Sequence, residues 1–186
     1  MQTLTSLVQP GDVIADFGCG NGRLLKALPS VNFHYYGFDD NQQLLEQAKR
    51  NFPQHQFDFC RLPDMPNQSL QYDKVFLIAV FQHLVDQADR QLALRRIYQS
   101  LKPGGRLLMT NWRLWSWRYL PYMFKRLNKK IAWNDFFIPW NHTVWRYYHG
   151  FTQSELQRLL TQAGFIVEQQ EIQGYNYLTV AIRPLE

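Results

Sequence analysis

An acidic side chain stands beside three closely spaced glycines near the start of the chain. Asp16 lies within the apolar run Val13–Phe17, and Gly18, Gly20 and Gly22 follow it at alternate positions. Glycines have no Cβ, so their backbone N–H groups can approach a ligand closely where a strand runs into a turn and the start of a helix. This stretch therefore predicts a ligand cradle with a carboxylate in its wall.

The carboxylate and the glycine spacing together indicate which ligand the cradle would hold. The dinucleotide fingerprint has its third glycine where this chain has Arg23. Asp16 would repel a pyrophosphate, but its charge suits a ligand that carries ammonium and sulfonium groups. We therefore expect S-adenosylmethionine, and not NAD, as the cofactor. A glycine-rich turn without a ligand is the alternative.

Three further carboxylates follow the next two predicted strands. Asp39 and Asp40 end the second strand, where an acidic side chain can accept hydrogen bonds from both hydroxyls of a ribose. We assign this role to Asp39 and consider Asp40 or Asn41 as the cap of the next helix, and the alternative is that both acids are only capping residues. Asp58 ends the third strand, where a carboxylate could accept from an adenine amino group; a surface turn residue is the alternative.

The fourth predicted strand closes with the segment Ile78–His83, which we expect to line the same cleft. His83 could act as a base there. A single histidine after a strand is more often structural, so both readings stay open.

Predicted strands and helices alternate along the chain, which indicates a doubly wound α/β sheet. Ligands of such sheets bind at the carboxyl ends of the strands, where the glycine turn lies. Hydrophobic periodicity and turn residues predict strands at 13–17, 34–38, 54–60, 72–80, 106–110, 165–170 and 175–182, and helices at 22–28, 40–51, 89–101 and 152–163.

Some boundaries carry specific signals. Lys102–Gly105 is expected to end the third helix. Thr152 and Glu155 are expected to form a capping box at the start of the last helix. The last two strands are expected to pair as a hairpin at the sheet edge.

Length and composition are those of a globular domain. With 186 residues, 46% of them hydrophobic and 19% charged, the chain is expected to form one domain over residues 1–186. No apolar run approaches the ~20 residues of a membrane span, and the N-terminus lacks the features of a signal peptide. Two cysteines without metal-ligand spacing favour a cytoplasmic protein with neither a metal nor a membrane. The net charge of +5 permits an anionic partner such as RNA.

Residues 111–150 interrupt the alternation. All six tryptophans lie here, and the stretch is too aromatic to be disordered, so we predict a substrate-side insertion or lid before the last helix. Residues 111–130 hold six Lys or Arg and no acid, interleaved with aromatic residues. Cations and stacking rings together suit a single-stranded tRNA loop. An amphipathic lid over a small apolar substrate, or a membrane-surface helix, is an alternative.

The pattern Asp16-x-Gly-x-Gly, Asp39, Asp58, Ile78-Ala-Val and Lys102-Pro-Gly-Gly resembles the class I S-adenosylmethionine-dependent methyltransferases over nearly the whole chain. The resemblance implies a Rossmann-like fold with a seven-stranded, mostly parallel sheet whose last strand is reversed. It also implies a methionine site at the glycine loop, a ribose site at Asp39 and an adenine site at Asp58. The expected cofactor-binding residues are Asp16, Gly18, Cys19, Gly20, Asn21, Asp39, Asp40, Asp58, Ala79 and Val80.

A narrower resemblance lies downstream. Ile138-Pro-Trp140, then Arg146-Tyr-Tyr-His149, then Ala163-Gly-Phe165 are similar to the tRNA methyltransferases that esterify carboxymethyluridine at the wobble position. This resemblance implies a substrate in the tRNA anticodon loop and a small activator subunit as a partner. Two features depart from that family. Only about a dozen residues precede the first strand, where the family has a longer segment, and Gln82 stands where a histidine is common.

Methyl transfer to a carboxylate needs alignment and a cation more than it needs a base, because the acceptor is already ionised at neutral pH. We expect Arg146 to bind the carboxylate or a phosphate through its planar guanidinium. Tyr147 and His149 complete the expected catalytic set as hydrogen-bond donors or stacking partners, and an aromatic lid strand is the alternative. Two other functions stay open: a small-molecule O- or N-methyltransferase, and a non-catalytic subunit that binds a partner through the Trp-rich insertion.

Overall fold

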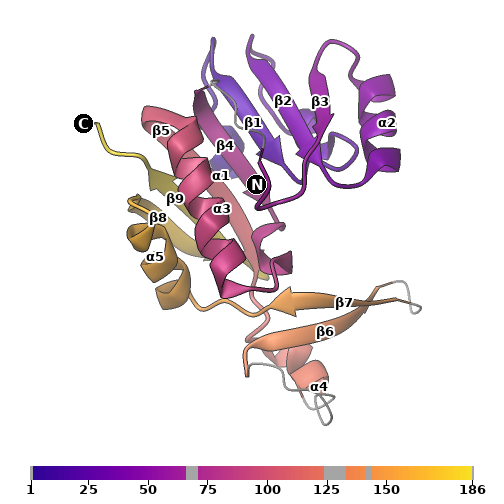
Figure 1. The fold of residues 1–186 in the computed structure, drawn as a ribbon, viewed down its shortest axis with the longest axis vertical. Helices are drawn as coiled ribbons and strands as arrows, with labels where there is room; N and C mark the ends of the chain where they lie inside the picture. The colour runs from indigo at the N-terminus through magenta and orange to yellow at the C-terminus, as the bar shows by residue number, and fades with distance from the viewer. Residues whose placement is uncertain (1, 66–70, 124–132, 141–143, 186) are drawn as a thin grey trace.

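Seven strands form one sheet in the computed structural model, which describes residues 2–65, 71–123, 133–140 and 144–185. Neighbouring strands are parallel except β9, which is antiparallel to β5 and to β8. The expected mostly parallel sheet with a reversed last strand is confirmed (Figure 1). In spatial order the strands are β3 (Gln56–Phe59), β2 (His34–Asp39), β1 (Val13–Phe17), β4 (Tyr72–Ile78), β5 (Leu101–Trp112), β9 (Asn176–Ile182) and β8 (Ile166–Gln173).

Helices α3 (Gln87–Ser100) and α5 (Gln153–Gln162) cover one face of this sheet. Leu94 and Leu156 from the two helices pack into the same core as alternate residues of the central strands, such as Val75. Side chains on a strand point alternately to the two faces, so the intervening residues of β4 must be covered by a second layer.

The second layer contains α2 (Gln42–Asn51), a short 3₁₀ helix η1 (Arg23–Lys26) and the N-terminal α1 (Gln2–Thr5). Leu45 of α2 and Leu24 of η1 pack with the residues of β4 that face away from α3. Both faces of the central strands are therefore buried, which explains their continuous apolar sequence. No helix among the described residues has the length and apolarity to cross a membrane.

Several predicted boundaries were wrong. The helix expected at 22–28 is only the 3₁₀ turn η1, because Gly22 at its start adopts a left-handed φ of 81° and still belongs to the loop. Of the two expected caps of α2, Asp40 and Asn41, the structure uses Asn41, whose side chain accepts from Leu44 N at 3.2 Å. Lys102–Gly105 lies inside β5, one residue after α3 has ended and the chain has become extended.

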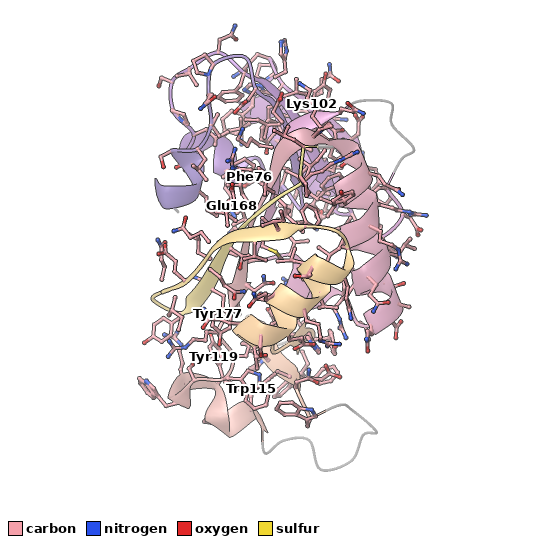
Figure 2. The ribbon with its side chains drawn as sticks, turned by 90° about the vertical axis from the view of Figure 1, so that its left-hand side faces the viewer. Phe76, Lys102, Trp115, Tyr119, Glu168 and Tyr177 are labelled. Atoms are coloured by element: carbon pink, nitrogen blue, oxygen red, sulfur yellow. The ribbon has the colours of Figure 1, made fainter. Side chains whose placement is uncertain are left out.

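Beyond β5, the described residues of the inserted segment include a second, two-stranded antiparallel sheet of β6 (Asp135–Trp140) and β7 (Val144–His149), with η3 (Trp117–Tyr119) and α4 (Leu120–Met123) beside it. Figure 1 shows this hairpin and α4 together at one end of the molecule. In Figure 2 Trp115 and Tyr119 lie at that end and Lys102 at the opposite one. The predicted insertion thus has a structure of its own, and four of its cations, Lys125, Arg126, Lys129 and Lys130, lie outside the described residues.

Candidate functional site

The glycine loop folds tightly against the end of β2. The backbone N–H groups of Gly18 and Cys19 both donate to the carbonyl of Phe38, at 2.6 and 3.0 Å. Gly18 has a φ of +78°, and a Cβ at this position would lie 2.2 Å from Cγ2 of Val80. Glycine is therefore required at position 18 both by the backbone conformation and by the side chain that passes over it.

Asp39 ties this loop to the start of α2. Its Oδ2 accepts from the backbone N–H of Gly20 at 2.8 Å, and its Oδ1 accepts from that of Asn41 at 2.9 Å. Each carboxylate oxygen keeps a second lone pair for a ligand hydroxyl. Asp40 takes a different position: it is exposed and forms an ion pair with Arg61 at 3.2 Å.

Asp16 carries a buried carboxylate oxygen for which the described part of the chain supplies no partner. The side chain is 2% exposed, and its Oδ2 accepts from the hydroxyl of Tyr35 at 2.6 Å. Its Oδ1 has no hydrogen-bond partner. Burial raises the pKa of Asp16 to about 7, against the opposing effects of Tyr35 and Arg23. A cationic ligand would supply both the missing partner and the missing charge.

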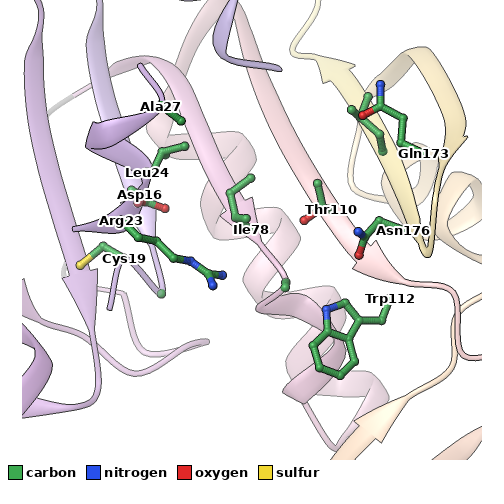
Figure 3. Close-up of a pocket in the computed structure, with 13 residues that line it drawn as sticks. Asp16, Cys19, Arg23, Leu24, Ala27, Ile78, Thr110, Trp112, Gln173 and Asn176 are labelled. Carbon is green, nitrogen blue, oxygen red and sulfur yellow. The ribbon is translucent and has the colours of Figure 1, made fainter. Parts of the chain in front are cut away.

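Arg23 extends from η1 toward the same space as Asp16 (Figure 3). In the sequence, Arg23 stands out only as the residue that breaks the dinucleotide fingerprint. The signal for its role was present, because a cation directly after the last glycine of a loop lies near whatever the loop binds. A carboxylate and a guanidinium in one wall suit the ammonium and carboxylate of an amino acid.

Two adjoining hollows lie at the carboxyl ends of β1 and β4. The smaller, of about 390 Å³, extends from Asp16 to Asn176 at the start of β9. The larger, of about 860 Å³, extends from Asp39 to Arg146 of the β6–β7 hairpin. Trp112 is among the residues that line both, so the two hollows form one cleft across the sheet.

The predicted cofactor residues line this cleft with one exception. Asp58 is exposed and is not among the lining residues, because side chains alternate along β3 and Phe57 is the one that enters the core. Cys60 and Arg61, just after the strand, line the cleft instead. The lining residues from the predicted set are Asp16, Gly18, Cys19, Gly20, Asn21, Asp39, Asp40, Ala79 and Val80.

The hairpin brings β7 over the end of β4. Arg146, Tyr147 and Tyr148 line the larger hollow together with His83, which lies more than sixty residues away in the sequence. Nδ1 of His83 donates to the carbonyl of Tyr147 at 3.2 Å. Loss of solvation beneath the hairpin lowers the pKa of His83, so the imidazole is neutral at physiological pH and its Nε2 can accept a hydrogen bond.

Tyr147 is fixed in place by its hydroxyl, which lies 2.8 Å from Oδ1 of Asp135 and 3.3 Å from the carbonyl of Val85. Burial, followed by the neighbouring Asp135, raises the pKa of Tyr147, so the hydroxyl is a permanent donor at neutral pH. This contact ties β7 both to β6 and to the segment that precedes α3.

The structure places His149 away from the cleft. The ring is 2% exposed, and its Nδ1 and Nε2 lie 2.9 Å from Asp135 Oδ1 and 3.0 Å from Glu155 Oε1. The predicted capping box of α5 is therefore half formed: Thr152 Oγ1 accepts from the Glu155 N–H, but the Glu155 carboxylate points to His149. His149 joins the hairpin to α5 and lies behind Tyr147, where it cannot touch a ligand in the cleft.

Comparisons with known proteins bear on the chemistry of this cleft. A family model described as a methyltransferase domain matches residues 15–107, which is half of the chain. A tRNA (carboxymethyluridine(34)-5-O)-methyltransferase of Schizosaccharomyces pombe is 27% identical over 92% of this chain and 81% of its own length. A Macaca fascicularis protein with the same name followed by ALKBH8 is 35% identical over 55% of this chain.

The chain spans only 15% of the length of that ALKBH8 protein. It is 26% identical, over 73% of its own residues, to a Mus musculus protein named "Probable tRNA methyltransferase 9B", and it spans 27% of that protein's length. Among solved structures, a SAM-dependent methyltransferase of Methanosarcina mazei superposes with a TM-score of 0.88 at 19% identity, over 99% of this chain and 98% of its own. A methyltransferase solved with the Trm112 methyltransferase activator of Haloferax volcanii superposes with a TM-score of 0.75 at 17% identity, over 100% of this chain and 88% of its own. These two likenesses concern the fold.

Proposed function

The chain belongs to the methyltransferase-domain family and is an enzyme that uses S-adenosylmethionine, and on that premise we propose that it methylates tRNA. The proposed product is the methyl ester of 5-carboxymethyluridine at the wobble position of the anticodon loop. The relatives of S. pombe and M. fascicularis carry that activity in their names, which supports the proposal. Because the proposed substrate is tRNA, the proposal includes the expected cytoplasmic location of the enzyme.

The residues of the glycine loop fit the cofactor. S-adenosylmethionine supplies a methyl group activated by its bond to a sulfonium sulfur. We assign its ammonium group to the unpartnered Oδ1 of Asp16 and its carboxylate to Arg23, which reaches the same hollow. Asp39, already held by two backbone N–H groups, would accept from the ribose hydroxyls. Asp58 would reach adenine only if its side chain turned toward the cleft, so the segment after β3 is the better candidate.

One observation carries the choice of acceptor: the hairpin brings Arg146 into the hollow that begins at the glycine loop. A carboxylate acceptor is ionised at neutral pH and needs no base. It needs a cation that holds it in line with the methyl group, and a guanidinium stays charged and binds carboxylates in a fixed plane. Arg146 would perform this task, and the buried Tyr148 beside it would exclude water.

Tyr147 and His149 take supporting roles in this proposal. The Tyr147 hydroxyl is bound to Asp135 and Val85, so Tyr147 would hold β7 over the cleft and present its ring there. His149 lies behind it and would keep the hairpin fixed to α5 through Glu155. Arg146 is then the member of the expected catalytic set that contacts the acceptor.

Exposed aromatic and cationic side chains of the inserted segment support an RNA substrate. Trp117 and Trp145 are 76% and 50% exposed, so each presents ring surface on which a base could stack. The Arg118 guanidinium lies 5.0 Å from the centre of the Tyr175 ring at the turn before β9. Single-stranded nucleic acids are bound by such stacking surfaces together with cations.

We also propose that a small activator protein assists the enzyme. The support is the likeness in fold to a methyltransferase solved with the Trm112 activator of H. volcanii. Measuring transfer with and without added Trm112 from a tRNA-modifying complex tests this partner separately from the substrate.

The test of the substrate is a transfer assay with methyl-labelled S-adenosylmethionine. Total tRNA, first treated with mild alkali so that existing esters become free carboxylates, is one acceptor; an extract of small metabolites is the other. Label that enters tRNA and is released as methanol by a second alkali treatment supports the proposal. Label in tRNA that resists alkali would contradict the ester but keep the RNA substrate.

A small-molecule methyltransferase is the second candidate. A small-molecule acceptor would have to bind beside the cofactor in the same cleft, and the larger hollow of that cleft, at about 860 Å³, lies within the size range of small-molecule sites, roughly 300–1,000 Å³. In that case label would enter the metabolite extract alone, and tRNA would neither bind nor compete. Binding to tRNA that weakens steeply with salt would contradict this candidate.

A further inference from the structure

Three side chains on neighbouring strands form a polar row across the smaller hollow. Trp112 at the end of β5 pairs with Asn176 at the start of β9, and Asn176 pairs with Gln173 at the end of β8. Directly paired residues of a sheet place their side chains on the same face. Figure 3 shows the three side chains on the side of the hollow that lies across from Asp16.

This row lies on the face of the sheet that α1, α2 and η1 cover, at the point where that covering ends. Two residues earlier on β5, Thr110 pairs with Leu178, and both are still buried. One step further back Leu108 pairs with Val180, inside the core beneath α1 and η1. The apolar face thus gives way to side-chain amides at the edge of the cleft.

Asn176 has no hydrogen bond from its side chain to any residue that the structure describes, and it is partly exposed in the hollow. A primary amide offers one donor and one acceptor side by side. The imide edge of uracil offers an N–H beside a carbonyl, which is the complement of that pair. Paired hydrogen bonds of this kind are how side-chain amides discriminate between bases.

The row is joined to the acceptor end of the cleft through stacked rings. The Trp112 ring stacks on Tyr148 at 5.0 Å between ring centres and 15° between ring planes. Tyr148 lies two residues after Arg146 on β7, so these two side chains share a face of that strand. The imide N3–H of uracil points away from carbon 5, which bears the carboxymethyl group. Trp112 lines both hollows, so a base placed against it would direct its imide edge toward Asn176 and its carboxymethyl group toward the hollow of Arg146.

We propose that Asn176, held in the row with Trp112, is the residue that binds the imide edge of the acceptor uracil and so makes the enzyme specific for uridines. This inference rests on the proposed function, because it assigns the base of the acceptor whose carboxylate was assigned to Arg146.

The experiment uses two anticodon stem-loop RNAs, one with 5-carboxymethyluridine and one with the same nucleoside methylated at N3, which removes the imide donor. The wild type should show kcat/KM lower by about tenfold or more on the N3-methylated RNA. Asn176→Ala should lose a similar factor on the unmodified RNA, mainly in KM, with no further loss on the N3-methylated one. Gln47→Ala, which removes an exposed amide from α2, is the matched control and should behave as the wild type. Calorimetry should give all three proteins the same affinity for S-adenosylmethionine, which also shows that the variants fold.

The outcomes separate this inference from the function on which it rests. If the wild type methylates the unmodified RNA and Asn176→Ala keeps both its KM and its discrimination against N3-methylation, Asn176 does not bind the imide and the inference is wrong while the function stands. If the wild type methylates neither RNA, with or without the activator, the proposed function fails and the inference fails with it.

Discussion

Replacing Asp16 by asparagine should make the free protein more stable at alkaline pH while it removes cofactor binding. Asp16 is buried, one of its oxygens has no hydrogen-bond partner among the residues that the structure describes, and burial raises its pKa from 3.8 to about 7. In the absence of the proposed ligand, the buried charge of Asp16 therefore lowers the free energy of unfolding. Asparagine has nearly the same shape and removes that charge.

The size of the effect follows from the two pKa values. Their difference of about three, at about 1.4 kcal/mol for each pKa unit, corresponds to a cost of about 4 kcal/mol once the carboxyl is ionised in the folded state. Because the pKa is raised, the folded state holds a proton that the unfolded state has lost between about pH 4 and pH 7. Stability therefore falls as the pH rises through this window, and the full cost is present above it.

Asparagine introduces an amide N–H that also lacks a partner, which offsets about 1–3 kcal/mol of the gain. The expected net increase in the free energy of unfolding is then about 1–3 kcal/mol near pH 8, or a few degrees in Tm for a chain of this size.

The assay is urea unfolding of the wild type and Asp16→Asn without cofactor, at about pH 5 and about pH 8. The advantage of the variant should be larger at the higher pH by about 2–3 kcal/mol. Asp58→Asn, which removes an exposed carboxylate, is the control and should change stability by less than about 0.5 kcal/mol at either pH. An equal advantage at both pH values, or a variant less stable than the wild type near pH 8, would refute the reasoning. Calorimetric binding of S-adenosylmethionine by Asp16→Asn with wild-type affinity would refute the role of Asp16 as its ligand.

Three further predictions concern the loop and the hairpin. Gly18→Ala should abolish cofactor binding and lower the free energy of unfolding by about 1–3 kcal/mol, because its Cβ would meet Val80 and its φ is positive; normal binding by calorimetry would contradict this. Arg146→Ala should keep cofactor affinity and lose transfer by about 100-fold or more, with partial recovery in Arg146→Lys, and a loss of cofactor affinity would show that the role assignment is wrong. His149→Ala should cost about 2–4 kcal/mol in urea unfolding, because it removes one hydrogen-bond partner from each of two largely buried carboxylates, Glu155 and Asp135, although Asp135 keeps the Tyr147 hydroxyl; Asp135→Asn should cost less, and a cost below about 0.5 kcal/mol for His149→Ala would contradict the contacts seen here.

The parallel half of the fold could be read from local sequence. A continuous apolar run such as Val75–Ile78 is stable only when both faces of a strand are covered, so it predicts a central parallel strand wherever it occurs. The three glycines that follow the first strand predicted a tight turn, and the structure shows why they are glycines: Gly18, Gly20 and Gly22 adopt positive φ values, which few other residues do at low cost. The loop, the acid that precedes it and the chemistry of the ligand are local properties, and they were predictable for that reason.

The hairpin and its contacts were not predictable in this way. Nothing in the string Arg146-Tyr-Tyr-His149 indicates that His149 turns away from the cleft, because its partners Asp135 and Glu155 come from two other elements. Burial of a histidine between carboxylates is set by how β6, β7 and α5 pack, which pattern and propensity do not encode.

The sequence by itself predicted the glycine loop at which we propose that the cationic cofactor binds, since that loop depends on residues within one strand and the turn that follows it. Only the tertiary structure decided which side chains lie across the cleft from this loop. Trp112, Asn176 and Gln173 become neighbours through the register of three strands, and Arg146 reaches them through a separate hairpin. A register shift of one residue would turn each of these side chains to the other face of the sheet, so the acceptor side of the site exists only once the strands have paired.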